Sequence, residues 1–392
     1  MRKDILLLGV AYVLSQFYRS FLSVLTVPLE RDLGAAADQL ASASGFWFLT
    51  FAAMQIPVGA ALDRIGPRRT AGWLFLFGGG GGALLFAVAT VPWHISAAMT
   101  LLGVGCSPVL MSAYYILARD FPAARFSTLA GLILGIGTSG SVFSTLPMVW
   151  AAEAFGWRGS VATLAIMSAV VAIGLLVVIR DPDQPDSDDH GSILDILKMP
   201  AMWVILPLMT VSYMPSGGFR GVWTGPYAFE VFGADQTTIG SIALILGVAM
   251  IIGSLAYGPA ERIFHTRKWV IFGGNAIGAV LCLAMVALPH DDLFRAVTLL
   301  TMTCFFTCSY ALLMSHGRAF FPPHLMGRGV SFMNLCGMVG VGVSQMVTGR
   351  LHEVTLDQGG SAADAFDRIF LFYFVALGVG LVLYLRAPDR ID

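Results

Sequence analysis

Two arginines stand inside long apolar runs of this 392-residue sequence. Arg19 lies in a run that extends to Pro28, and Arg220 lies in a run rich in Pro and Gly. A guanidinium within a bilayer costs at least roughly 2.5–3.5 kcal/mol, so such a residue normally faces a cavity and serves a function. The planar guanidinium fork holds carboxylate or phosphate through two parallel hydrogen bonds. The pair therefore predicts a small anion held between Arg19 and Arg220.

The distribution of acidic residues supports this interpretation. All 24 Asp and Glu fall in loops or at the ends of apolar runs, so no buried carboxylate can pair with either arginine. A cationic ligand would instead require an embedded carboxylate. The alternative is that both arginines reach the headgroups along extended side chains. For Arg19 this is a long reach, because Pro28 is ~13 Å away along a helix.

Other polar and aromatic side chains in the apolar runs could contact the same ligand. For each one taken alone, ordinary helix packing is an equally simple explanation. The candidates for substrate binding beside the arginines are Gln16, Tyr18, Tyr213, Trp223 and Tyr310.

Sulfur-containing side chains give an alternative site. Cys304 and Cys308 are four residues apart and share one helix face, and Met209 and Met214 lie near Arg220 in sequence. Thiolate and thioether ligands suit Cu(I). Met and Cys are also common fillers of apolar cores. Metal transport therefore remains the alternative, and otherwise we expect no metal site.

Enzymatic motifs are missing from the sequence. It contains no phosphate-binding Walker loop, no Ser/His/Asp arrangement and no ligand spacing typical of zinc. The formal net charge of −1 leaves no basic excess for a nucleic acid. We expect a protein that is not an enzyme, needs no cofactor and binds no nucleic acid.

The composition predicts an all-α membrane protein. Apolar residues make up 57% of the chain and charged residues only 12%, about half the charged fraction of a soluble domain, which is roughly 25%. Runs of 18 or more apolar residues can each cross a bilayer as a helix. We predict twelve spans, near residues 5–27, 41–62, 71–90, 94–117, 126–150, 161–179, 203–225, 238–258, 270–288, 296–316, 329–349 and 367–386.

The basic residues predict the orientation. With both termini in the cytoplasm, 16 of the 23 Lys and Arg fall on the cytoplasmic side and 5 outside, and the remaining two are Arg19 and Arg220. Such a bias follows the positive-inside rule. We expect a monomeric, multi-pass protein of the plasma (inner) membrane in contact with lipid.

The chain also contains an internal repeat. Asp63-Arg64 follows the second span, and Glu261-Arg262 follows the eighth, 198 residues later. Arg19 and Arg220 are 201 residues apart. A motif running from Arg119 to Pro122 is echoed from Arg318 to Pro322, with Arg328 behind it. These matches predict two six-helix bundles, residues 1–180 and 201–392, joined by a cytoplasmic linker at 181–200. Repeats of this kind place substrate sites between halves near mid-membrane.

The loop Gly59-x-x-x-Asp63-Arg64-x-Gly66-x-Arg68-Arg69 resembles the signature loop of the major facilitator superfamily. The twelve spans, the central acidic loop and the weaker second copy are similar to that family over essentially the whole chain. The stretch Tyr18-Arg19-Ser20-Phe21 followed by Pro28 weakly resembles the first span of its branches for organic anions and phosphate esters.

The resemblance implies two pseudo-symmetric bundles that rock around a central cavity. It also implies a cytoplasmic gate, in which Asp63 pairs near the start of the eleventh span and neighbouring arginines hold helix ends. Plain positive-inside anchoring is the alternative for these cations. The residues expected in the gate are Asp63, Arg64, Arg68 and Arg69, with Arg119, Glu261, Arg262 and Arg328 from the repeat.

These observations predict a secondary transporter that works by alternating access and carries a small organic anion. The usual proton-carrying residue, an embedded carboxylate, is missing. Anion exchange and symport therefore both stay open, and Glu30, Glu153 and Glu230 at outer span ends could still titrate. The alternatives are a Cu(I) or other metal transporter, an exporter of amphipathic compounds, and a non-transporting sensor built on the same fold.

Overall fold

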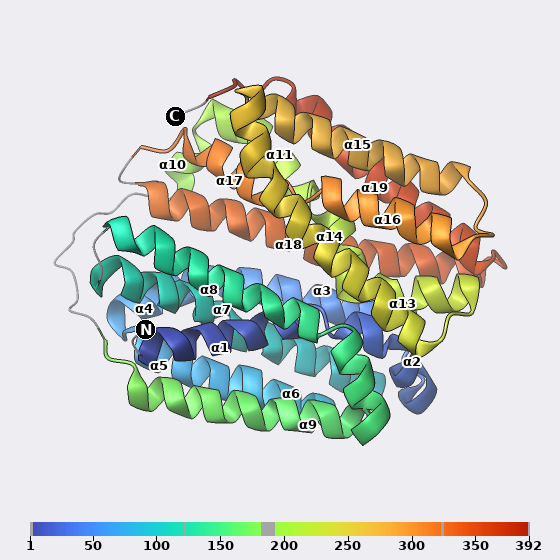
Figure 1. Cartoon of the computed structure of the whole chain (residues 1–392), viewed down its shortest axis with the longest axis horizontal. Helices are drawn as coiled ribbons and strands as arrows, with labels where there is room; N and C mark the ends of the chain where they lie inside the picture. Colours follow the sequence, from blue (N-terminus) through green and yellow to red (C-terminus); the bar gives the residue numbers. More distant parts are fainter. Residues whose placement is uncertain (1–2, 121–122, 182–192, 323–324, 391–392) are drawn as a thin grey trace. The chain divides into compact units, whose positions relative to one another are not determined.

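The computed structural model describes residues 3–120, 123–181, 193–322 and 325–390 (Figure 1), and within them all regular secondary structure is helical. Most of the predicted linker, residues 182–192, and Phe121 and Pro122 of the repeated motif lie outside the described residues. The chain divides into two compact units, Met1–Asp186 with Asp235–Ser241, and Ser187–Ala234 with Ile242–Asp392.

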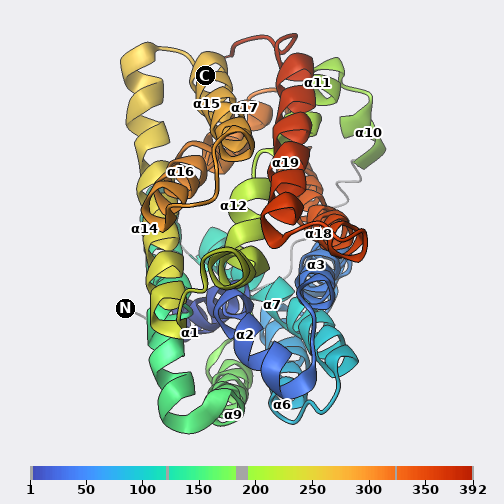
Figure 2. The same cartoon turned by 90° about the vertical axis from the view of Figure 1, so that its right-hand side faces the viewer.

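The helices of the N-terminal half are α1 (Lys3–Tyr18), α2 (Leu22–Leu33), α3 (Ala37–Ala53), α4 (Gln55–Arg64), α5 (Pro67–Leu74), η1 (Phe75–Gly80), α6 (Gly81–Ala87), α7 (Pro92–Asp120), α8 (Ala123–Phe143) and α9 (Leu146–Val178). Those of the C-terminal half are α10 (Ile193–Leu197), α11 (Pro200–Val211), α12 (Met214–Gly218), η2 (Phe219–Trp223), α13 (Thr224–Pro226), η3 (Tyr227–Val231), α14 (Gln236–Phe264), α15 (Lys268–Ala287), α16 (Leu293–Phe306), α17 (Tyr310–Arg318), α18 (Met326–Asp357) and α19 (Ala362–Tyr384). The elements marked η are π-helical. Figure 2 shows the helices of each unit from a second side.

The prediction of an all-α membrane protein is confirmed. Among the described residues, nine helices are long and apolar enough to cross a membrane, or ten if the bent pair α1 and α2 is one span. Of the other predicted spans, the fifth contains the shorter apolar helix Leu129–Phe143 and the seventh is divided into α11, α12, η2, α13 and η3. Apolar side chains such as Val177 and Leu255 are at least 70% exposed, as expected for surfaces that face lipid.

The limits predicted for the first span need correction. It runs from Lys3 to Leu33 and bends by 52° between α1 and α2. At the bend the Ser20 hydroxyl is 2.7 Å from the Ser144 hydroxyl, and the Ser23 hydroxyl donates to the Ser20 carbonyl. Serine side chains thus satisfy backbone and hydroxyl groups where the helical ladder is interrupted. An apolar run gives no sign of such a break.

Glycines bring the same pair of helices together in each half. A Cβ on Gly140 of α8 would lie 1.9 Å from the Val13 carbonyl oxygen of α1. A Cβ on Gly340 of α18, 200 residues later, would lie 1.9 Å from the Thr210 carbonyl oxygen of α11. Backbones approach this closely only where no side chain intervenes. These two glycines therefore serve packing, and the contact repeats at the repeat interval.

Apolar packing holds each bundle around these contacts. In the first unit Phe86 lies between Phe21, directly before α2, and Trp157 of α9, with ring centroids 5.1 and 6.0 Å away. In the second unit, side chains of α11, α17 and α19 share a core that contains Leu208, Leu313, Leu377 and Tyr384. Helix association in a bilayer depends on such packing.

Gly140→Ala should destabilise the protein, because the added methyl group meets the backbone of α1 and overpacking costs ~1–3 kcal/mol. Gly135→Ala on the same helix is the matched control, since a Cβ there meets nothing within 4 Å. Removing an exposed helical glycine should leave stability unchanged or raise it by up to ~1 kcal/mol. Thermal unfolding of the purified protein compares the two variants. Equal melting temperatures would contradict the packing role.

Candidate functional site

Arg19 lies at the bend of the first span, outside both α1 and α2. Its guanidinium carbon is 5.5, 5.6 and 5.8 Å from the ring centroids of Trp47, Phe48 and Phe51 on α3. Trp47 and Phe51 are stacked at 5.1 Å. Aromatic faces attract a cation, so these three rings form an aromatic cage that holds Arg19 in place at the bend.

The neighbours of Arg19 on α1 point in different directions. Tyr18 is fully buried, and its hydroxyl contacts the Ser168 hydroxyl at 2.8 Å and the Leu164 carbonyl at 3.1 Å, both on α9. Gln16 is half-buried, and its amide donates to the Tyr12 hydroxyl at 2.6 Å. The hydroxyl of Tyr18 is therefore engaged within the first unit, whereas Gln16 remains partly accessible.

Arg220 lies in the π-helical segment η2, in the middle of the divided seventh span. The span is divided within the run that is rich in Pro and Gly. The Nη1 of Arg220 donates to the Tyr213 hydroxyl at 3.3 Å. Its Nη2 is buried and has no hydrogen-bond partner among the described residues. A buried charged donor left unpaired costs several kcal/mol, which a bound anion would offset.

A series of side-chain contacts extends from Arg220 through Tyr213 and Tyr310 within the second unit. The ring of Tyr213 lies 5.8 Å from that of Tyr310, and the Tyr310 hydroxyl donates to the side-chain oxygen of Asn334 on α18. Tyr310 begins α17 just after residues 307–309, which separate it from α16. Trp223, in contrast, is fully buried, and its indole N–H donates to the Thr348 hydroxyl at 3.0 Å. The structure thus groups Arg220, Tyr213 and Tyr310, and turns Trp223 into the core.

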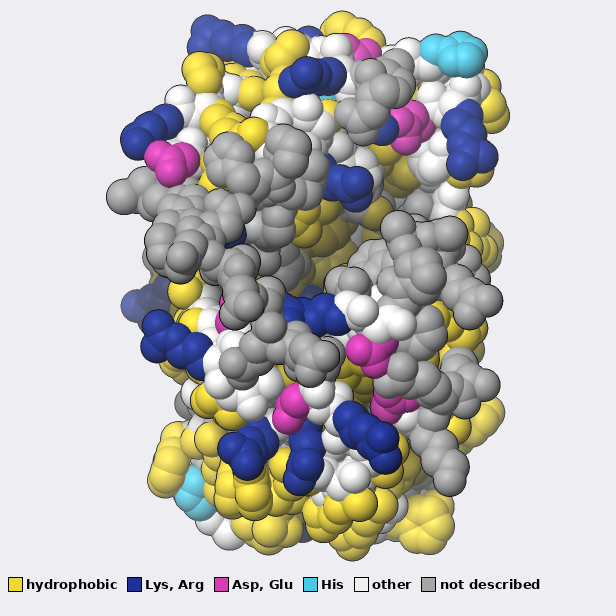
Figure 3. Space-filling model, turned by 90° about the vertical axis from the view of Figure 1, so that its left-hand side faces the viewer, with side chains coloured by type: hydrophobic (Ala, Val, Ile, Leu, Met, Phe, Trp, Pro, Cys, Tyr) yellow, Lys and Arg dark blue, Asp and Glu magenta, His cyan; other side chains and the backbone are white. Residues whose placement is uncertain are grey.

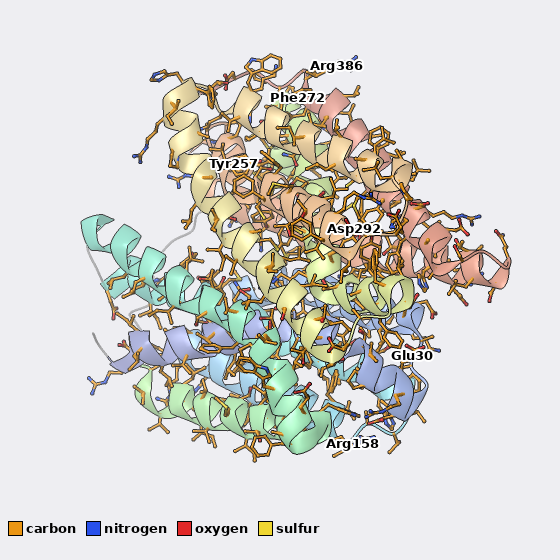
Figure 4. All side chains as sticks on the ribbon, turned by 45° about the vertical axis from the view of Figure 1, so that its right-hand side comes forward. Glu30, Arg158, Tyr257, Phe272, Asp292 and Arg386 are labelled. Carbon is orange, nitrogen blue, oxygen red and sulfur yellow. The ribbon has the colours of Figure 1, made fainter. Side chains whose placement is uncertain are left out.

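The carbonyl groups at the end of α16 are also satisfied. Tyr257 lies on α14 (Figure 4). Its hydroxyl donates a hydrogen bond to the carbonyl oxygen of Phe306, which is the last residue of α16. The Thr307 hydroxyl is 2.5 Å from that of Ser216 on α12. The interruption of the tenth span, and with it the position of Tyr310, is therefore held by polar contacts with two neighbouring helices.

The loop between α4 and α5 packs around the carboxylate of Asp181, which follows α9. Gly66 has φ +91°, and a Cβ there would be 2.5 Å from the side-chain oxygen of Asp181. That oxygen accepts a hydrogen bond from the Arg68 amide at 2.8 Å. The Asp181 side chain thus caps α5, and only glycine at position 66 leaves room for it.

The residues predicted for the gate in the first unit lie in this loop and on α7. Asp63 is exposed, and Tyr115 of α7 lies near its carboxylate. The guanidinium of Arg119 lies 4.0 Å from the Tyr115 ring centroid. The other cations of the loop, Arg64, Arg68 and Arg69, are exposed. The pairing of Asp63 with the eleventh span stays a prediction.

The loop between α14 and α15 repeats the arrangement. Asp389, behind the last helix, accepts hydrogen bonds from the Lys268 amide at 3.0 Å and the Arg267 amide at 3.2 Å. The carboxylate of Glu261 pairs with the Arg267 side chain. Arg262 is exposed, and Arg328 lies half-buried in the first turn of α18. In each half, a carboxylate that follows the last helix caps the helix after the loop.

Basic side chains gather at these loop ends of the units (Figure 3). Within the first unit the N-terminus lies at the same end as the α4–α5 loop (Figure 1), and in the second unit Asp389 near the C-terminus contacts the α14–α15 loop. The cytoplasmic orientation of both termini stays a prediction.

Comparison with known proteins identifies the family. A sequence model described as "Major Facilitator Superfamily" matches residues 8–345. The chain belongs to the Major Facilitator Superfamily. The predicted family, and the expectation of a multi-pass membrane protein from a transporter family rather than an enzyme, are confirmed.

Named relatives within the Major Facilitator Superfamily are distant. The "Probable L-galactonate transporter" of Escherichia coli (strain K12) is 24% identical over 301 residues, which cover 69% of this chain and 62% of that protein, so the chain matches less than two thirds of its length. The "Putative tartrate transporter" of Agrobacterium vitis is 22% identical over 420 residues, which cover 97% and 94%.

Solved structures share the fold. A bacterial homologue of the human lysosomal transporter Spinster, inward-facing and unoccupied, superposes with a TM-score of 0.81 at 16% identity and covers 98% of this chain and 96% of that one. A D-xylose-proton symporter superposes with a TM-score of 0.73 at 15% identity, with coverage of 95% and 96%.

The sulfur-containing candidates are all buried. Cys304 lies on α16, Cys308 in the interruption after it, Met209 on α11 and Met214 at the start of α12. In the part of the chain that the structure describes, no group of three or more His, Cys, Asp or Glu could hold a metal ion. These positions agree with core packing and leave the metal alternative without added support.

Sequence patterns missed the aromatic cage of Arg19. The signal was present, because Trp47 and Phe51 are four residues apart and share a face of α3 with Phe48 beside them. Only the fold shows that this face meets the bend of the first span. The caps formed by Asp181 and Asp389 were likewise missed, since no local motif connects a helix N-terminus with a residue more than 100 positions away.

Asp389→Asn should lower the melting temperature of this superfamily member at neutral pH and have less effect in acid. Partial burial of Asp389 favours its neutral form, but hydrogen bonds from Thr266 and from the amides of Lys268 and Arg267 hold the pKa of Asp389 below its usual value. A carboxylate with a lowered pKa stabilises the fold above its unfolded pKa, and this contribution is lost as the pH falls through the folded pKa. Melting curves of both proteins between pH 7 and pH 3 measure the difference. A constant gap over that range would argue against the cap.

Proposed function

We propose that this protein is a secondary transporter that works by alternating access and carries a small organic anion bound by Arg19 and Arg220. Membership of the Major Facilitator Superfamily supports transport. The observation that carries the anion is the Arg220 guanidinium, whose Nη2 is buried without a hydrogen-bond partner in the described structure. Two named relatives are described as transporters of L-galactonate and tartrate, which are hydroxycarboxylates.

The surroundings of each arginine suit such a ligand. Arg220 and the hydroxyls of Tyr213 and Tyr310 offer donors to a carboxylate and to hydroxyl groups beside it. The aromatic cage of Trp47, Phe48 and Phe51 holds the guanidinium of Arg19 at the bend of the first span. Both arginines stand where their spans are interrupted, and substrate sites of secondary transporters typically form at such discontinuous helices.

Alternating access requires that the site open to one side at a time. The capped loops around Asp63 and Glu261 lie at one end of each unit, and each loop carries three Lys or Arg. We assign these loops to the gate, with Arg119 and Arg328 beside them. Under this assignment a gate variant changes transport and leaves anion binding intact.

Thermal-shift measurements on the purified protein test the anion site. Tartrate and L-galactonate are the anionic probes, and D-xylose is the uncharged control. Ligand binding raises the melting temperature as ligand concentration exceeds Kd. Wild type should respond to an anion but not to xylose. In Arg220→Gln and Arg19→Gln the apparent Kd should rise about 10- to 100-fold, as expected for loss of a charge-assisted hydrogen bond.

Arg386→Gln is the matched control, because Arg386 is exposed beyond the last helix. It should bind the anion as wild type does. Equal anion binding by wild type and both site variants would overturn the proposed site. Stabilisation by Cu(I) but by no anion would transfer the site to Met209, Met214, Cys304 and Cys308.

A further inference from the structure

The end of the seventh span carries two contacts between a histidine and a carboxylate. His352 Nε2 of α18 is 2.8 Å from the Glu230 carboxylate of η3. His290 Nε2 is 2.9 Å from the Asp367 carboxylate of α19, and its Nδ1 is 2.9 Å from the Tyr227 hydroxyl of η3. The π-helical segment η3 is therefore tied to its neighbours through two titratable pairs, all within the second unit.

Of the two pairs, Glu230–His352 is the more deeply buried. The side chains of His352 and Glu230 are 4% and 21% exposed, against 8% and 33% for His290 and Asp367. The imidazole of His352 is surrounded by aromatic rings, with centroids of Trp223 at 5.2 Å and Phe366 at 5.4 Å. A single negative charge is costly in such surroundings. A proton on the imidazole makes the pair neutral overall and places a cation beside two aromatic faces.

The charged residues on the surrounding elements are paired elsewhere. Arg350 pairs with Glu353, and Arg295 with Asp291. Arg368 donates to Gln358, Asp364 takes part in the N-terminal cap of α19, and Asp292 caps α16. Glu230 is the carboxylate that His352 contacts, at 2.8 Å. Histidine is also the side chain that ordinarily changes charge between pH 5 and pH 8.

Trp223 connects this pair with Arg220. The two residues are one turn apart on η2, and the Trp223 indole donates to Thr348. Thr348 lies one turn before His352 on α18, and the Trp223 ring packs against the His352 imidazole. A change in the charge of His352 thus acts directly on the helical segment that carries Arg220.

We infer that the Glu230–His352 pair is a proton-binding site that couples proton movement to the anion bound at Arg220. In the tautomer whose Nε2–H donates to Glu230, Nδ1 of His352 takes the proton, and the net charge of the pair changes from −1 to zero. A monocarboxylate and one proton then cross the membrane together with no net charge. The coupling rests on the proposed anion transport, whereas the proton site itself does not.

Tryptophan fluorescence tests the proton site without any anion. A protonated imidazole quenches the emission of an indole in contact with it, so wild type should lose emission as the pH falls from 8 to 5. His94 lies 4.3 Å from Trp93 and contributes a second step, so the experiment uses a His94→Gln background. In that background the step should disappear in His352→Gln and in Trp223→Phe. Persistence of the step in His352→Gln would overturn the proton site.

Anion affinity measured at two pH values tests the coupling. With L-galactonate, a monocarboxylate, as the probe, the apparent Kd of wild type should rise about tenfold or more between pH 5.5 and pH 7.5, as for an ordinary coupling free energy. His352→Gln and Glu230→Gln should bind L-galactonate with little pH dependence. His265→Gln, an exposed loop residue, should behave as wild type.

The two hypotheses fail in different ways. A fluorescence step that depends on His352, with no anion bound by any variant, would support the proton site and overturn the proposed function. Anion binding that needs Arg220 but has the same pH dependence in wild type and His352→Gln would support the proposed function and overturn the coupling.

Discussion

A positive charge inside an apolar bundle needs compensation, and the architecture around Arg220 depends on how that compensation is provided. No Asp or Glu is available within the apolar runs, and Tyr213 supplies a single neutral acceptor. The Nη2 of Arg220 is therefore a hydrogen-bond donor without an acceptor in the described structure. In a membrane protein such an arrangement persists only if a ligand or water-filled cavity serves it. This constraint connects the composition of the chain with the proposed substrate.

Interruptions in the helices provide positions where a buried arginine can reach a ligand. In a continuous α-helix the backbone groups bond to one another, so none of them is available to a ligand or to a charged side chain. In this chain the first, seventh and tenth spans are each interrupted, at Arg19, around Arg220 and before Tyr310. Neighbouring hydroxyls take over the backbone groups that the interruptions release. Gly140 and Gly340 bring the adjacent helices within backbone contact, so the interrupted spans remain held by rigid neighbours.

The proton site adds an electrical argument to the same picture. A transporter that moves only an anion also moves charge across the membrane potential, at ~2.3 kcal/mol per elementary charge per 100 mV. A buried histidine beside a carboxylate accepts one proton without leaving a net charge in the protein. Glu230 thus gains a role through its contact with His352, although it lies ten residues beyond Arg220 on the same span.

The sequence by itself determined the membrane class and the family, because apolar runs, charge positions and the loop at Asp63 are local patterns. It also indicated the internal repeat, two arginines as candidates for the site, and a run rich in Pro and Gly around Arg220. The tertiary structure decided which side chains face one another. Trp223 and Tyr18 are turned into packed cores, Trp47 and Phe51 hold Arg19, and His352 meets Glu230 122 residues away. These choices depend on helix rotation and on where each helix bends. Both are set by packing between helices distant in sequence, and no local pattern records them.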